Sequence, residues 1–167
     1  DYASSDLKLE EMPYSPTSVS GLTVSGTIRS YGSASESITV TLVPIGGSPL
    51  VKSVSGSSVT YSFTGVSAGN YTLKVQKKGH APWTESITVS NQNIYGKDVT
   101  VYLWGDVNRD GKVNGTDALW VRQSSAGGRT LDAYQKVLAD LNRDGKVNGT
   151  DALWIRQISA GSRVLNY

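Results

Sequence analysis

The chain has 167 residues, which allows one large domain or two small ones. Its formal net charge of +2 is small, and no Lys/Arg block is longer than Lys77-Lys78, so we exclude a nucleic-acid partner. It contains no cysteine, which excludes disulfides and thiol chemistry, and no apolar run approaches the roughly 20 residues of a membrane-spanning helix.

The first residues do not predict a packed structure. Residues 1–18 carry Asp, Glu, Ser and two prolines without sustained periodicity, which indicates a linker or, at most, a short first strand. The chain begins without Met and without the charged-then-apolar order of a signal peptide. We therefore expect a fragment of a longer polypeptide, with any export signal outside this stretch.

Residues 19–104 alternate between apolar and polar positions. Period-2 runs separated by Gly, Ser, Pro and Asn clusters are typical of antiparallel strands with one buried face. About seven such strands make a small all-β sandwich of the Ig-like or transthyretin-like kind. The alternating runs lie at 22–28, 38–42, 59–63, 71–75, 87–89 and 99–103.

One stretch of this region has a familiar order. The segment SFTGVSAGNYTLKVQKKGHAPW places Phe63, Val66, Gly69 and Tyr71 in a Phe-x-x-Val-x-x-Gly-x-Tyr pattern. The pattern resembles the carboxypeptidase-regulatory-like or CnaB-like β-sandwich modules. The resemblance implies an architecture and a role as spacer or stabiliser, and no chemistry.

The period changes from Gly105 onward. Helix-like runs at 117–123 and 151–157 each follow a polar loop, and apolar residues recur at helical spacing between them, from Leu131 to Leu141. Thr130 is placed as the N-cap of this middle helix, with Asp132 in its first turn. Residues 105–167 are therefore predicted to be all-helical, in the order loop, helix, helix, loop, helix.

The polar loop is written twice, as DVNRDGKVNGTDALW from Asp106 and as DLNRDGKVNGTDALW from Asp140. Calcium takes about 6 to 8 oxygen ligands, and a loop that wraps it presents an oxygen at about every second residue and bends sharply midway at Gly. Asp-Asn-Gly loops are also common turns, but two near-identical copies, each running into a helix, favour two calcium sites. Magnesium fits so many protein oxygens less well, and zinc lacks its His and Cys ligands. The predicted ligands are Asp106, Asn108, Asp110, Lys112 (carbonyl), Asn114 and Asp117, and then Asp140, Asn142, Asp144, Lys146 (carbonyl), Asn148 and Asp151.

Each loop closes with Asp where an EF-hand ordinarily has Glu, and the first loop has no entering helix. A duplicated loop-plus-helix of this kind looks like the dockerin module of cellulosome systems, over about 105–167. The sandwich upstream is similar to the X-module that accompanies many dockerins, particularly those of scaffoldins. The resemblance implies calcium-dependent folding and non-catalytic binding to a cohesin module. It also implies an extracellular, bacterial setting in which polysaccharide-degrading enzymes are assembled or attached to the cell surface.

The resemblance also implies where the partner binds. Dockerins contact cohesin through loop positions 10 and 11 and through helix residues one to two turns later. Trp120 and Trp154 are favoured as core residues, with an interface anchor as the alternative. All these positions are the same in both copies, so we expect an internal two-fold and two binding orientations. The implied contacts are Gly115, Thr116, Arg122, Gln123, Gly149, Thr150, Arg156 and Gln157.

The arginines of the helical half suit the same interpretation. This half carries no Glu, and an acidic cohesin face would suit its positive charges. Solvated helix faces are an equal alternative for Arg109 and Arg143. The six arginines are Arg109, Arg122, Arg129, Arg143, Arg156 and Arg163.

Other functions stay open at this stage. Trp83, Trp104 and nearby tyrosines could form a flat sugar-binding platform, which would make the chain a calcium-stabilised carbohydrate-binding fragment of a secreted enzyme. A catalytic set would need His80, which we expect at the surface with no nucleophile elbow nearby. A calcium switch like calmodulin is disfavoured by the closing Asp. The sequence leaves the cohesin type and the parent protein undecided.

Overall fold

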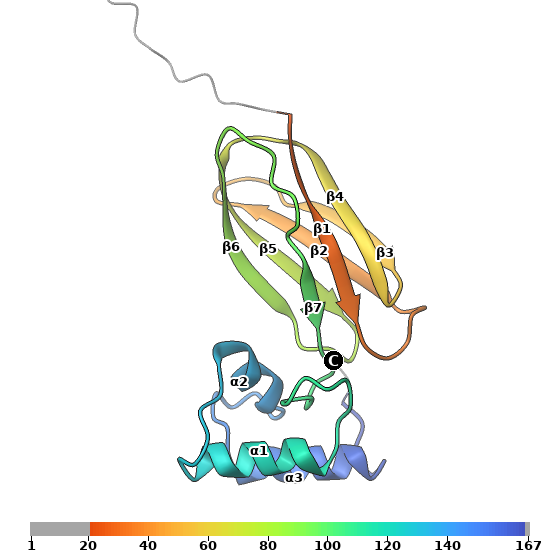
Figure 1. Ribbon diagram of the computed structural model, residues 1–167, viewed down its shortest axis with the longest axis vertical. Helices are drawn as coiled ribbons and strands as arrows, with labels where there is room; N and C mark the ends of the chain where they lie inside the picture. Colours follow the sequence, from red (N-terminus) through yellow and green to blue (C-terminus); the bar gives the residue numbers. More distant parts are fainter. Residues whose placement is uncertain (1–20, 166–167) are drawn as a thin grey trace, which may run out of the picture.

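The computed structural model describes residues 21–165, so the predicted linker at 1–18 lies outside the described residues. A two-sheet β-sandwich occupies residues 22–101, and a helical module follows it (Figure 1). The last strand runs directly toward the helices, and α2 lies between the sandwich and the other two helices (Figure 1). The predicted two-module class is confirmed.

Among residues 21–165, seven strands form the sandwich. One sheet has the order β4-β1-β7, with β1 antiparallel to β4 and parallel to β7. The other sheet is antiparallel throughout, in the order β3-β2-β5-β6. The strands are β1 (Leu22–Ser30), β2 (Ser37–Pro44), β3 (Leu50–Ser55), β4 (Ser58–Val66), β5 (Gly69–Lys77), β6 (Trp83–Val89) and β7 (Val99–Val101).

The predicted alternation supplies the sandwich core. Ile28 of β1, Val40 of β2 and Leu73 of β5 have no exposed surface, and they point between the sheets with the other members of one buried cluster. Strand β3 was not predicted. Its residues are mostly exposed because it lies at a sheet edge, so it leaves no alternation in the sequence.

Three helices make the second module: α1 (Gly115–Ser125), α2 (Ala133–Ala139) and α3 (Gly149–Ser159). Helices α1 and α3 pack against each other. Their core faces carry equivalent residues, because Ala118 and Val121 in α1 match Ala152 and Ile155 in α3, and all four are buried. The duplicated sequence therefore folds as a duplicated structure.

The start of α2 differs from the prediction. Its N-cap is Asp132, two residues after Thr130. The Asp132 carboxylate accepts from the backbone N–H of Gln135 at 2.8 Å, and the Gln135 side chain accepts from the backbone N–H of Asp132 at 3.0 Å. This reciprocal capping box satisfies two unpaired donors at once, which one Thr hydroxyl would not do.

The two modules share a small buried cluster. Ala81 of the sandwich, Trp104 and Leu138 of α2 are buried together, and Tyr134 packs against them. The Tyr134 hydroxyl also donates to the Ala81 carbonyl at 2.9 Å. Close packing without a linker, expected from the short distance between Leu103 and the first loop, agrees with these contacts.

His80 is buried near this junction, so the expected surface position is wrong. Its side chain is 5% exposed. Nδ1 lies 2.9 Å from the Lys78 carbonyl oxygen and Nε2 lies 2.6 Å from the Tyr31 carbonyl oxygen. Each ring nitrogen faces a backbone carbonyl oxygen, and the nitrogen that carries the proton donates to its carbonyl, which lets the ring be buried. Among residues 21–165, no helix has the length and apolar character needed to cross a membrane.

Candidate calcium loops and recognition surface

The closing Asp of each loop connects its two ends. Asp117 is fully buried, and its carboxylate accepts from the backbone N–H of Asn108 at 3.0 Å and of Asn114 at 2.9 Å. Asp151 likewise accepts from Leu141 at 3.0 Å and Asn148 at 2.9 Å. A carboxylate at this position therefore fixes the start of the loop to the first turn of the helix.

The opening Asp of each loop holds the bend. Asp106 accepts from the backbone N–H of Asp110 at 3.1 Å and of Gly111 at 2.9 Å. The second loop repeats these bonds from Asp140, at 3.1 Å to Asp144 and 3.0 Å to Gly145. The bend also needs left-handed backbone at loop positions 4 and 6, in Arg109 and Arg143 as well as in both glycines.

The carboxylates of the first loop are crowded and poorly hydrated. Burial raises the pKa of Asp106 to about 6, with the nearby charges of Asp117 and Asp110 adding to the rise against the backbone N–H groups that oppose it. Burial also raises the pKa of Asp117 and of Asp151. Negative charges held this close favour a cation among them.

The donor set fits a hard cation, because every predicted ligand supplies oxygen. Within the described residues, no three Asp, Glu, His or Cys side chains form a group that could hold a metal ion. Carboxylates alone therefore do not complete either site, and the Asn oxygens and the Lys112 and Lys146 carbonyls would have to join them. Two calcium ions stay a prediction.

Three candidate partner residues of each copy are exposed at the surface. Gly115, Thr116 and Arg122 are exposed on α1, and their counterparts Gly149, Thr150 and Arg156 are exposed on α3. The two helices pack together, so the structure brings the two sets onto one pair of helices. Figure 1 shows α1 and α3 on the side of the module away from the sandwich.

Sequence reasoning missed two apolar residues on this surface. Leu119 is 50% exposed and Leu153 is 53% exposed, each two residues after the Asp that closes its loop. Helical geometry could have revealed them, because Ala118 and Val121 define the buried face and Leu119 lies off it. Exposed leucines thus lie at equivalent places on the two paired helices.

Trp120 and Trp154 are half-buried, each with one side against the helical core. The other side is covered by an arginine of the chain itself, with the guanidinium carbon 3.8 Å from the ring centroid in Arg129–Trp120 and in Arg163–Trp154. The side-chain oxygens of two glutamines hold these arginines, Gln123 at 2.9 Å and Gln157 at 2.7 Å. The Trp and Gln side chains that were candidates for the partner interface therefore make contacts within the chain itself.

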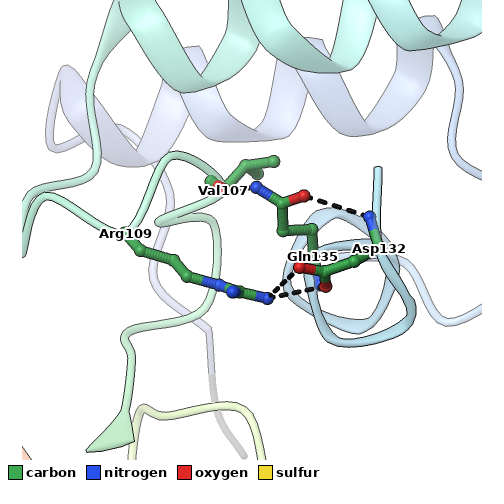
Figure 2. Close-up of polar contacts among 4 residues, drawn as sticks. All are labelled: Val107, Arg109, Asp132 and Gln135. Carbon is green, nitrogen blue, oxygen red and sulfur yellow. Dashed lines mark hydrogen bonds and ion pairs between the residues drawn. The ribbon is translucent and has the colours of Figure 1, made fainter. Parts of the chain in front are cut away.

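Arg109 makes specific contacts within the chain and is only partly exposed to solvent. Its Nη2 donates to both carboxylate oxygens of Asp132, at 2.6 and 2.8 Å (Figure 2). Its guanidinium carbon lies 5.5 Å from the centroid of the Tyr134 ring. Figure 2 also shows the Gln135 side-chain amide at the Val107 carbonyl, a bond of 3.0 Å. The first loop is thereby joined to the N-terminus of α2.

The sugar platform is not formed as the sequence suggested. Trp83 stands edge-on to Tyr134, at 86° with ring centroids 4.9 Å apart. Trp104 is 7% exposed, and the guanidinium of Arg143 lies 5.0 Å from its ring centroid. A flat stacking surface needs coplanar, exposed rings, and these two tryptophans do not provide one.

Comparison with known protein families gives a match over the duplicated loop-helix region. Residues 104–158 match the dockerin type I domain. Two solved structures are similar, an N-terminal and a C-terminal interface mutant of a type II cohesin–X-dockerin complex from Acetivibrio cellulolyticus. Each is 26% identical, with 81% of this chain and 93% of the other covered and a TM-score of 0.36. No curated protein matches this chain. Residues 104–158 of this chain are therefore a dockerin type I domain.

Proposed function

We propose that this chain is a non-catalytic docking protein whose helical module binds a cohesin module in the presence of calcium. One observation carries the proposal: the same exposed residues recur on two helices that pack together. Thr116 and Arg122 on α1 recur as Thr150 and Arg156 on α3. The membership of residues 104–158 in the dockerin type I family supports the same conclusion.

The partner surface follows from the residues on these helices. Leu119 and Leu153 supply apolar area, and Arg122 and Arg156 supply positive charge beside it. A complementary cohesin face would be apolar at its centre and acidic around it. Because the two copies present the same residues, either α1 or α3 can lead the interface, with the module turned by about half a rotation between the two orientations.

Calcium has a structural part in this proposal. Two ions, one in each loop, would neutralise the buried carboxylates and join each loop to its exit helix, so metal binding and folding become one equilibrium. The sandwich, proposed as an X-module at 19–104, stabilises the dockerin at 105–167. The setting is the outside of a bacterial cell, where the complex assembles cellulosomal enzymes or attaches them to the surface.

The first test is calorimetric titration of the chain with a panel of cohesins, in millimolar calcium and in excess chelator. We expect tight binding to at least one cohesin, lost when calcium is removed. Binding that survives the chelator would contradict the calcium requirement. Absence of binding to every cohesin, with the helical module folded, would contradict the docking function.

The two orientations need a separate test with Leu119→Asp, Leu153→Asp and the double variant. Each single variant should leave one helix able to lead, so we expect affinity within about tenfold of the original. The double variant should abolish binding. Val51→Asp is the control, because Val51 is 58% exposed on the sandwich edge strand β3, outside the helical module. Loss of binding in one single variant and none in the other would mean a single orientation.

A further inference from the structure

The two loops have nearly the same sequence but different surroundings. Gly111 and Gly145 occupy the same loop position with nearly the same backbone, at φ +86° and +81°. A Cβ on Gly111 would lie 2.5 Å from the ring of Tyr31 in the sandwich, whereas a Cβ on Gly145 would have nothing within 4 Å. The bend of the first loop therefore packs closely against a side chain of the sandwich, and the bend of the second loop does not.

Tyr31 is itself held in place. It follows β1 and stacks on Tyr102, which follows β7, with ring centroids 5.4 Å apart and planes 24° apart. Arg109 of the first loop lies 5.9 Å from the Tyr102 ring centroid. Tyr31 and Tyr102, which follow two neighbouring strands of one sheet, thus form an aromatic support against the first loop.

The opening carboxylate is also more deeply buried in the first loop than in the second. Asp106, which opens the first loop, has no exposed surface, whereas Asp140, at the same position in the second, is half-buried. The support does not distort the loop it contacts. The bond from Gly111 to Asp106 is 2.9 Å and the bond from Gly145 to Asp140 is 3.0 Å, so the hydrogen bonds at the bend are the same in both loops.

We propose that the β-sandwich supports the first calcium loop alone, so that the two loops bind calcium with unequal affinity and the first binds it more tightly. This rests on the proposed calcium binding. A loop that is already held in its binding geometry loses less conformational freedom when the ion enters. The second loop has to order itself without the Tyr31 support, so it fills last and empties first.

The test is calcium titration of the full chain by calorimetry, with the amide resonances of Gly111 and Gly145 followed by NMR to assign each step. We expect two ions, with the Gly111 resonance shifting first. Tyr31→Ala should weaken the tighter site by about fivefold or more and leave the other unchanged. Tyr95→Ala is the matched control, because Tyr95 is a 67% exposed tyrosine between β6 and β7, and it should change neither site.

A second pair of variants keeps the proposal testable if Tyr31→Ala fails to fold. Gly111→Ala and Gly145→Ala share the cost of a left-handed alanine, and only the first also meets Tyr31. We expect Gly111→Ala to weaken its own loop about fivefold more than Gly145→Ala weakens its loop. Equal losses in these two variants, or two equal sites that Tyr31→Ala leaves alone, would overturn the inference while calcium binding stands. No calcium uptake by the unaltered chain would overturn both.

Discussion

The junction between the modules predicts a large effect for Leu138→Ala. Leu138 has no exposed surface and packs with Ala81 of the sandwich and Trp104. Truncating a buried leucine to alanine costs about 2–5 kcal/mol, through lost burial and the cavity that remains. Because the cavity would be bounded by two different modules, neither can close it freely, and we expect about 3 kcal/mol of lost unfolding free energy. For a chain of this size, that lowers Tm by about 6–12 °C.

Urea denaturation in millimolar calcium measures the change, with far-UV circular dichroism for the helices and tryptophan fluorescence for the junction. Val137→Ala is the control, because Val137 is the neighbour of Leu138 on the same helix and its side chain is 40% exposed. It should cost less than about 1 kcal/mol, as surface changes usually do. If Leu138→Ala costs no more than Val137→Ala, the two modules do not share a stabilising junction and the reasoning fails.

Three further predictions concern the helical module. Tyr134→Phe removes the 2.9 Å hydrogen bond to Ala81 and should lower the unfolding free energy by about 1 kcal/mol in the same assay; no loss would mean that this bond adds nothing. Arg129→Ala and Arg163→Ala should each cost about 0.5–2 kcal/mol, in equal amounts, because both guanidinium groups lie 3.8 Å from their ring centroids; a difference above about 1 kcal/mol would contradict the symmetry. Excess chelator should abolish the helical circular dichroism while the sandwich stays folded on its own core, and unchanged helical signal would show that calcium is not required for folding.

Much of the fold follows from local periodicity. Strands such as β2 and β5 alternate because one face is buried, and the alternation of Ile38, Val40 and Leu42 is visible in the sequence. Strand β3 could not be found in this way, because an edge strand with exposed side chains leaves no pattern. The N-cap of α2 was misplaced because Asp132 and Gln135 cap each other, and the sequence offered Thr130 as an equally good candidate.

The candidate site likewise has a part that the sequence predicts and a part that it does not. Loop ligands are local, since the oxygens of one loop lie within about a dozen residues, and spacing alone predicts them. The contacts of Arg109 are not local, because Asp132 and Tyr102 reach it only through the docking of α2 and the sandwich. His80 was placed at the surface for the same reason, because the carbonyl of Tyr31 that binds it lies far away in the sequence.

The duplication and the sandwich act on different parts of the helical module. Leu119 and Leu153 lie in nearly equal surroundings on α1 and α3, which lie away from the sandwich in Figure 1, so the repeat keeps its two-fold there. The two-fold is not kept at the bends of the loops, because Gly111 lies close to Tyr31 and Gly145 does not. A partner that binds the helices would therefore find two equivalent surfaces. A calcium ion that binds the loops would find two different sites. We expect partner binding to be degenerate and metal binding to be ordered, within one repeated sequence.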